Sequence, residues 1–140
     1  MSDAHLIQQN INRYSVGASQ ANWDMVMETY MPDGIWTVPA MGVTFRGHKE
    51  IRDGLIHFSS PNEYIVQLNT PALIEVEGDR ATAQSVIREC GKFKDRDEAI
   101  EVLGLYLDKL VRTPKGWKFS ERAFVLKGIH SFPMKVAGPQ

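Results

Sequence analysis

The sequence predicts an α+β domain in which a cone-shaped, curved sheet of antiparallel or mixed strands encloses a pocket, with about three N-terminal helices closing it. Two observations predict this class. Apolar residues recur at helical spacing up to residue 58, and long β-forming segments joined by turns follow from residue 63. The 140 residues suit one domain with one core. We expect a single domain over 1–140, with its core at about 5–127 and a loosely held C-terminal tail at 128–140.

The helical part divides into three segments. In residues 3–19, apolar side chains recur every three or four positions and form one face, which predicts the first helix. A short second helix follows Asn22, a residue type that caps helix starts, and the turn-forming run Pro32-Asp33-Gly34 ends it. Residues 48–58 repeat the apolar spacing, so we expect the third helix there.

The remaining segments are predicted to form the sheet. They are rich in β-forming residues and cover 34–39, 63–77, 81–93, 99–112 and 117–126. Pro71 cannot donate to a sheet ladder, so we expect the strand at 63–77 to bend there. The run Glu77-Gly78-Asp79-Arg80 is typical of a hairpin turn.

The last hairpin predicts which side chains lie opposite one another. A three-residue loop at 114–116 has proline first and glycine at the left-handed position, and it pairs Thr113 with Trp117. Opposite residues share a face, so this register joins two further pairs: Asp108 with Arg122, and Tyr106 with Phe124. A two-residue loop would instead place Asp108 against Glu121, which are like charges. We therefore favour the three-residue loop.

Alternation along the strands indicates which residues face the pocket. One face of the strand at 81–93 is small and apolar, as a concave interior requires, and it carries Ala81, Ala83, Ser85, Ile87 and Glu89. This places Glu89 near the rim of the pocket. The strand at 99–112 is partly apolar on both faces, so both faces need cover. Helices cover one face, and we expect a second copy of the chain to cover the outer face in a homodimer.

Composition excludes several classes of function. The formal net charge is −1 with acids and bases mixed along the chain, so we expect neither a nucleic-acid partner nor a membrane partner. Cys90 is the only cysteine and the four histidines match no metal-ligand spacing, so we expect no metal. The first residues lack the pattern of a signal peptide, and we expect a cytoplasmic protein.

Several short motifs, taken in order, resemble one family of domains. They include Arg13-Tyr14, Trp23-Asp24, the run from Tyr30 to Trp36, Arg46-Gly47-His48-Lys49-Glu50-Ile51, Val76-Glu77-Gly78-Asp79-Arg80-Ala81, Leu110-Val111-Arg112-Thr113 and Gly116-Trp117-Lys118-Phe119 with Arg122. Over about 5–127 the chain resembles SnoaL-like domains of the nuclear transport factor two-like superfamily. Relatives include scytalone dehydratase, ketosteroid isomerase and polyketide cyclases. The resemblance implies a cone-shaped fold, often dimeric, that binds small hydrophobic molecules and acts without cofactors.

The chain departs from its dehydratase and dehydrochlorinase relatives at two positions. Where those relatives carry an acid four residues before the tryptophan of the second helix, this chain has Ser19. Where they carry a histidine base on the strand after the third helix, the nearest residue is Tyr64. Their aspartate orients the imidazole that takes a proton from carbon, so this mechanism does not transfer to this chain.

For most of the candidate pocket residues, the sequence allows two interpretations: a role in the site or a purely structural role. Asp108 and Arg122 are either a base held by a guanidinium that also stabilises charge on the substrate, or a cross-strand ion pair. Glu89 is either a second pocket carboxylate or a solvated rim residue. Tyr14, Tyr64 and Tyr106 either donate hydrogen bonds to a substrate oxygen or pack in the core. The remaining candidates for ligand binding are Ser19, Trp36 and Phe124.

Two functions follow from these candidates. The first is a cofactor-independent acid/base enzyme of lyase, isomerase or hydrolase type, acting on a small hydrophobic, cyclic molecule, with Asp108, Arg122 and Tyr64 as catalytic residues. The second is a non-catalytic ligand-binding or accessory subunit, because the aspartate and histidine of the relatives are absent. Fold alone does not choose between them.

Overall fold

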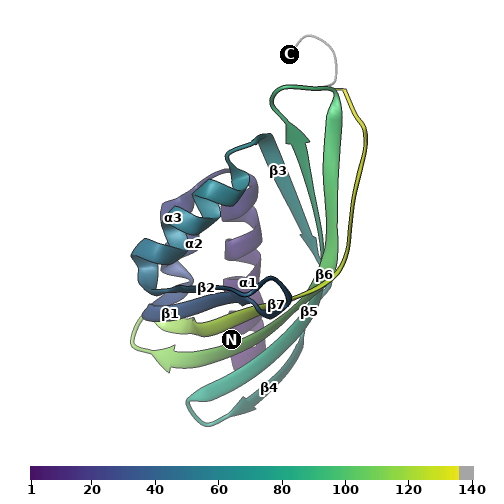
Figure 1. The fold of residues 1–140 in the computed structure, drawn as a ribbon. Helices are drawn as coiled ribbons and strands as arrows, with labels where there is room; N and C mark the ends of the chain where they lie inside the picture. Colours follow the sequence, from purple (N-terminus) through teal and green to yellow (C-terminus); the bar gives the residue numbers. More distant parts are fainter. Residues whose placement is uncertain (136–140) are drawn as a thin grey trace.

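A computed structural model describes residues 1–135 of the chain. Three helices come early in the sequence: α1 (Asp3–Ser19), α2 (Trp23–Glu28) and α3 (Gly47–Ser59). Seven strands make the sheet: β1 (Tyr30–Val38), β2 (Val43–Arg46), β3 (Asn62–Asn69), β4 (Leu73–Glu77), β5 (Arg80–Phe93), β6 (Glu98–Thr113) and β7 (Gly116–Pro133). A short 3-10 turn, η1 (Pro39–Met41), joins β1 to β2. The helices lie on the concave side of the curved sheet (Figure 1), which confirms the predicted α+β class.

The sheet is mixed and strongly curved. Its strands follow the order β2-β1-β7-β6-β5-β3, and β4 also pairs with β5. β1 runs parallel to β7, whereas the other pairs are antiparallel. The long strands β5, β6 and β7 bend as one surface around the helices (Figure 1). The concave face therefore combines residues from strands far apart in the sequence.

The predicted helices form where the apolar spacing placed them. α1 begins after Ser2, whose hydroxyl accepts a hydrogen bond from the backbone of His5, and it buries one apolar face against the sheet. Ile7, Ile11 and Tyr14 on that face are at most 1% exposed. Among residues 1–135, no helix is both long enough and apolar enough to cross a lipid bilayer.

Two predicted boundaries in the first strands are wrong. The segment Pro32-Asp33-Gly34 does not form a turn, because it lies within β1, where the pairing with β7 shifts register between Tyr30 and Ile35. Such a bulge tolerates proline without breaking the strand. The predicted strand at 63–77 is two strands, β3 and β4, that pair with different parts of β5. Pro71 lies in the break between them.

The final hairpin has a different loop from the predicted one. Thr113 pairs with Gly116, which leaves a two-residue loop, and Gly116 adopts a φ of +101°. A register shift after Lys109 leaves Ser120 unpaired, and this extra residue on β7 restores the pairing of Asp108 with Arg122. The predicted pairs Asp108 with Arg122 and Tyr106 with Phe124 therefore form, but through a bulge that was not predicted, and the predicted pair of Thr113 with Trp117 is wrong.

The predicted loose tail is wrong for the residues that follow Gly128. β7 continues to Pro133, which pairs with Glu98 at the start of β6. Because β6 begins as early as Glu98, it offers a ladder of hydrogen-bond partners to this part of the chain. The last part of the predicted tail, 136–140, lies outside the described residues.

Candidate functional site

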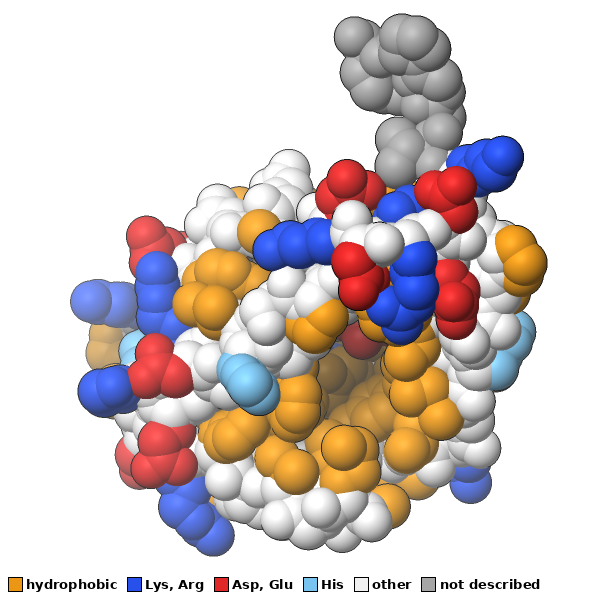
Figure 2. Space-filling view, turned by 45° about the horizontal axis from the view of Figure 1, so that its top comes forward, with side chains coloured by type: hydrophobic (Ala, Val, Ile, Leu, Met, Phe, Trp, Pro, Cys, Tyr) orange, Lys and Arg blue, Asp and Glu red, His pale blue; other side chains and the backbone are white. Residues whose placement is uncertain are grey.

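A cavity of about 340 Å³ lies between the concave face of the sheet and the helices. Its size is in the range of ligand pockets, roughly 300–1,000 Å³. Figure 2 shows an open hollow whose walls are mostly hydrophobic. The walls come from α1, α3 and most strands, and they include Tyr14, Ala18, Trp23, Trp36, Val38, Leu55, Phe58, Ile65, Gln67, Ile87, Glu89, Phe93, Val102, Tyr106, Phe124 and Leu126.

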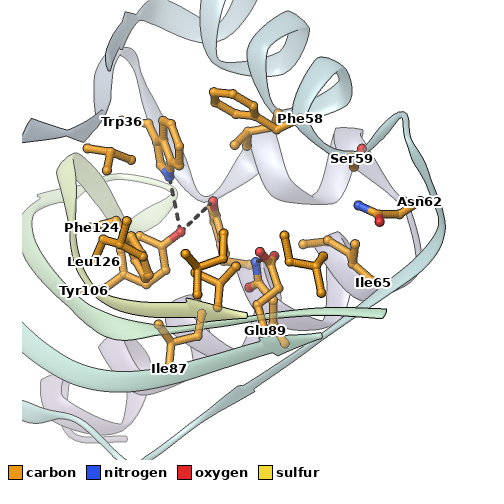
Figure 3. Close-up of a pocket in the computed structure, with 18 of the residues that line it drawn as sticks. Trp36, Phe58, Ser59, Asn62, Ile65, Ile87, Glu89, Tyr106, Phe124 and Leu126 are labelled. Atoms are coloured by element: carbon orange, nitrogen blue, oxygen red, sulfur yellow. Dashed lines mark hydrogen bonds between the residues drawn. The ribbon is translucent and has the colours of Figure 1, made fainter. Parts of the chain in front are cut away.

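Three polar groups meet around the hydroxyl of Tyr106. The indole nitrogen Nε1 of Trp36 donates a hydrogen bond of 3.2 Å to Tyr106 Oη, and the hydroxyls of Tyr14 and Tyr106 lie 3.4 Å apart (Figure 3). The two hydroxyls share one contact, so one of their two protons stays available to a ligand. A donor chain of this kind suits a ligand oxygen on which negative charge develops during a reaction.

Burial keeps these tyrosines protonated. Desolvation raises the pKa of Tyr14 well above its ordinary value, and the neighbouring Tyr106 raises it further. Desolvation also raises the pKa of Tyr106, although the charge of Arg122 opposes that shift. Both groups therefore remain phenols, and thus donors, around neutral pH.

The position of Trp36 depends on an aromatic stack against helix α3. Its ring stacks on Phe45 of β2 at 5.5 Å between centroids and 12° between planes. Phe45 can approach α3 only because residue 54 is glycine: a Cβ there would lie 2.1 Å from the Phe45 ring. Gly54 thus allows the packing that directs the Trp36 nitrogen toward Tyr106.

Among residues 1–135, Glu89 is the one acidic residue that lines the cavity. Its carboxylate points into the cavity from β5 (Figure 3). On the neighbouring strand β3, the side-chain amide of Gln67 donates a hydrogen bond of 2.8 Å to Glu89 Oε1. Desolvation raises the pKa of the Glu89 carboxyl, while the hydrogen bond from Gln67 opposes the shift. A carboxyl with a raised pKa beside phenol donors can exchange protons with a bound molecule.

Asp108 and Arg122 form an ion pair beneath this site. Arg122 donates two hydrogen bonds to the Asp108 carboxylate, of 2.7 and 3.1 Å, and both side chains are 0% exposed. Neither residue lines the cavity. The guanidinium lies 3.7 Å from the ring centroid of Tyr106 and 4.4 Å from that of Tyr14. The Asp108–Arg122 pair therefore packs against the two tyrosine rings on the side away from the cavity.

The protonation of this pair follows from its burial. Desolvation raises the pKa of the Asp108 carboxyl, and the charge of Arg122 and its hydrogen bonds oppose the rise. Desolvation disfavours the charge of Arg122, but Asp108 holds its pKa above the ordinary value. Arg122 therefore carries a positive charge inside the core, and Asp108 is its partner.

The structure brings together five of the nine predicted site residues at the cavity wall. These are Tyr14, Trp36, Glu89, Tyr106 and Phe124. Tyr64 lies elsewhere: β3 directs Ile65 and Gln67 inward, so Tyr64 is 40% exposed on the opposite face and its hydroxyl donates to Met134 Sδ. Ser19 also lies outside the cavity lining, and its hydroxyl accepts a hydrogen bond from the backbone of Gln67.

Sequence reasoning missed Gln67 as the partner of Glu89. The signal was present in the alternation of β3, because Gln67 shares a face with Ile65 and lies opposite Glu89 on β5. It also missed Phe58 and Phe93, which line the cavity from the end of α3 and the end of β5. Both lie next to predicted loops, where alternation gives no direction.

Comparison with solved structures shows that this fold is shared. A protein assigned as an aromatic ring hydroxylase from Novosphingobium aromaticivorans is 22% identical, with a TM-score of 0.84 and 93% of each chain covered. A protein assigned as a scytalone dehydratase from the same species is 18% identical, with a TM-score of 0.82 and coverage of 99% of this chain and 97% of that one. A type 2 hexachlorocyclohexane dehydrochlorinase is 18% identical, with a TM-score of 0.83 and coverage of 96% and 92%.

Comparison by sequence identifies the family. A search of curated proteins returned no match. The model of the SnoaL-like domain matches residues 1–123, which is most of the chain. The curved mixed sheet, the N-terminal helices and the apolar cavity agree with that match. This protein belongs to the SnoaL-like family.

Proposed function

We propose that this protein is a cofactor-independent acid/base enzyme, of lyase or isomerase type, that acts on a small hydrophobic, cyclic carbonyl compound bound in the cavity. The observation that carries the proposal is the pairing of two kinds of group in one apolar pocket. Glu89 supplies a carboxylate, and the chain formed by Trp36, Tyr106 and Tyr14 supplies a hydrogen-bond donor. SnoaL-like relatives with dehydratase or dehydrochlorinase names support this class of reaction.

The proposed reaction begins with proton transfer from carbon. The Glu89 carboxylate takes a proton from the carbon next to the substrate carbonyl. The electron pair of that C–H bond forms a C=C bond to the carbonyl carbon, and the π pair of the C=O bond moves to the oxygen. The tyrosine hydroxyl that keeps a free proton donates a hydrogen bond to the resulting enolate oxygen. In a substrate with a C=C bond next to that carbon, the enolate extends over this bond, and protonated Glu89 returns its proton to the far end of it, which shifts the double bond and completes an isomerisation. Alternatively, a leaving group departs from the neighbouring carbon and takes up that proton, which completes an elimination.

In this proposal Asp108 and Arg122 are positioning residues. The catalytic role expected for Asp108 would require its carboxylate to touch the substrate, but two hydrogen bonds from Arg122 occupy it below the cavity wall. Arg122 instead acts on the donors, because its positive charge lies against the faces of Tyr106 and Tyr14. This charge makes the hydroxyls stronger donors toward an enolate.

Deuterium exchange tests the proposal without knowledge of the natural substrate. Tetralone, a bicyclic ketone with exchangeable protons next to its carbonyl, is incubated with the protein in heavy water and followed by NMR. We expect the wild type to accelerate exchange above buffer, and Glu89→Gln to reduce the acceleration by about 100-fold or more. Equal exchange in the two proteins, with tetralone bound to both, would favour a non-catalytic ligand-binding protein.

We also propose that the protein forms a homodimer through the outer face of the sheet. Apolar side chains exposed on this face come from three strands: Val66, Leu68, Val86, Leu103 and Leu107. A patch of this kind on a sheet face is typical of an interface. Light scattering at micromolar concentration tests the proposal: Leu107→Glu should shift the dimer to monomer, whereas Val16→Glu on the exposed side of α1 should not.

A further inference from the structure

Within residues 1–135, the buried charged side chains are paired, whereas the half-buried Glu89 is not. Lys92 is 4% exposed and lies 3.6 Å from Glu63, Glu101 is bonded to Arg88 and to His130, and Asp108 is bonded to Arg122. Within residues 1–135, Glu89 has no salt bridge to a lysine, arginine or histidine, and its hydrogen bond comes from a neutral amide. A carboxylate that is taken out of water without a cation is energetically costly. Glu89 therefore leaves uncompensated negative potential in the cavity.

The cavity wall reinforces this imbalance. Its described lining contains no lysine, arginine or histidine, and Glu89 is the only carboxyl group in it. Arg122 is fully buried but does not line the cavity: it donates two hydrogen bonds to Asp108 and lies against the ring of Tyr106. Desolvation is the largest cause that raises the pKa of Tyr106, and the charge of Glu89 adds to the rise, so the potential of Glu89 extends to the tyrosine donors. Apolar walls screen such a potential far less than water does.

From these observations we infer that the cavity selects its ligand by charge: it accepts uncharged apolar ring compounds and apolar cations, and it excludes carboxylates and other anions. This inference rests on the proposed function only in taking the cavity as the ligand site. An anion entering the cavity would lose its hydration, would find no cation, and would meet the like charge of Glu89. A neutral carbonyl compound avoids all three costs and uses the tyrosine donors. An amidinium or ammonium group would compensate Glu89 directly.

Three probes of matched shape test this selection. Naphthamide is neutral, naphthoate is an anion and naphthamidine is a cation, and all share one ring system and one substituent position. Each competes with a neutral, solvatochromic naphthalene ketone dye whose fluorescence reports on the cavity, at mildly alkaline pH. In the wild type we expect naphthamide and naphthamidine to displace the dye, and naphthoate to bind about tenfold more weakly or worse.

Two variants separate the charge of Glu89 from the apolar character of the wall. Glu89→Gln keeps the size of the side chain and should reduce the difference in binding affinity between naphthamide and naphthoate. It should also weaken the binding of naphthamidine by about tenfold. Glu75→Gln removes the same charge from an exposed position on β4 and should leave all three affinities unchanged. Retained affinity for the neutral dye shows that each variant is folded.

The inference is overturned if naphthoate binds as well as naphthamide, if no probe displaces the dye, or if Glu89→Gln leaves the probe affinities as they are in the wild type. These outcomes are distinct from failure of the proposed function. If the probes bind according to charge but the protein does not accelerate deuterium exchange of tetralone, the proposed enzymatic function is refuted and the inference on charge selection stands. If the protein accelerates the exchange but the probes bind without regard to charge, the inference is refuted and the proposed enzymatic function stands.

Discussion

Gln67 on β3 donates its amide hydrogen to the Glu89 carboxylate on β5 across a distance of 2.8 Å. The two residues face each other in a mostly apolar wall, and the amide is the one hydrogen-bond partner that the described residues give this carboxylate. An amide stabilises a carboxylate less than a cation does. Glu89 is therefore held in place and kept reactive, unlike the fully paired Asp108 below it.

The first prediction concerns the stability cost of Glu89. Because the folded state raises the pKa of this carboxyl, the folded protein holds the proton more tightly than the unfolded chain. The stability linked to this group is present at low pH and is lost as pH rises through the folded-state pKa. Glu89→Gln has no carboxyl group to ionise and therefore does not lose this stability. It should raise the free energy of unfolding by about 1 kcal/mol at mildly alkaline pH.

Denaturant unfolding at several pH values measures this effect, with Glu75→Gln as the control for net charge. The gain in Glu89→Gln should disappear below the ordinary pKa of glutamate, where both states are protonated. A variant that is equally stable or less stable than the wild type under alkaline conditions would show that Glu89 carries no burial penalty.

The second prediction concerns the hydroxyl of Tyr106. Tyr106→Phe removes the acceptor of the Trp36 N–H, which is then left buried without a partner, and this should cost about 1–3 kcal/mol of stability. The same change should slow tetralone exchange by about 100-fold, because the donor chain is broken. Tyr64→Phe deletes an identical hydroxyl from the outer face and serves as the matched control. Similar results for the two variants would contradict the proposed donor site.

The third prediction concerns the buried ion pair. Asp108→Asn leaves the fully buried Arg122 without a carboxylate and should lower the free energy of unfolding by about 3–5 kcal/mol. The double variant Asp108→Leu with Arg122→Met removes both charges and should recover much of that loss in urea unfolding. If Asp108→Asn were as stable as the wild type while tetralone exchange was abolished, Asp108 would be a catalytic residue rather than a positioning one.

The fourth prediction concerns the aromatic stack behind the donor site. Gly54→Ala places a Cβ against the Phe45 ring, so the stack on Trp36 must shift or α3 must move away from the sheet. We expect a loss of about 1–3 kcal/mol and weaker binding of the neutral dye. Gly128→Ala is the control, because a Cβ at that position meets no atom within 4 Å. If Gly54→Ala bound the dye as tightly as the wild type does, the position of Trp36 would not matter for ligand binding, which would contradict the prediction.

Sequence reasoning recovered the face of β5 more reliably than that of β3. In β5, small and apolar residues alternate with polar ones, so the buried face and the place of Glu89 follow directly. In β3, Ile65 and Leu68 are apolar on opposite faces, and the prediction relied on the position nearest to a histidine of the relatives. That choice placed Tyr64 in the site, whereas the pleat turns it outward.

The sequence could not predict that Asp108 and Arg122 lie below the cavity wall rather than on its surface. Register correctly predicted that Asp108 and Arg122 pair on the inner face. It could not show that the rings of Tyr14 and Tyr106 lie beside the guanidinium and keep it from the cavity, because the two tyrosines meet only when α1 packs on β6, across 92 positions of sequence. The bulge at Ser120 was likewise invisible, since it follows from the competition between two registers in the final hairpin.

Carboxyl-selective ¹³C NMR titration of Glu89, with the cavity empty and then filled by naphthamide, tests most directly whether this carboxylate is the reactive group of the pocket. The account predicts a pKa above the ordinary glutamate value in the free protein, and a further rise when the neutral ligand displaces water. An ordinary pKa that naphthamide leaves unchanged would place Glu89 in contact with bulk water and contradict the account.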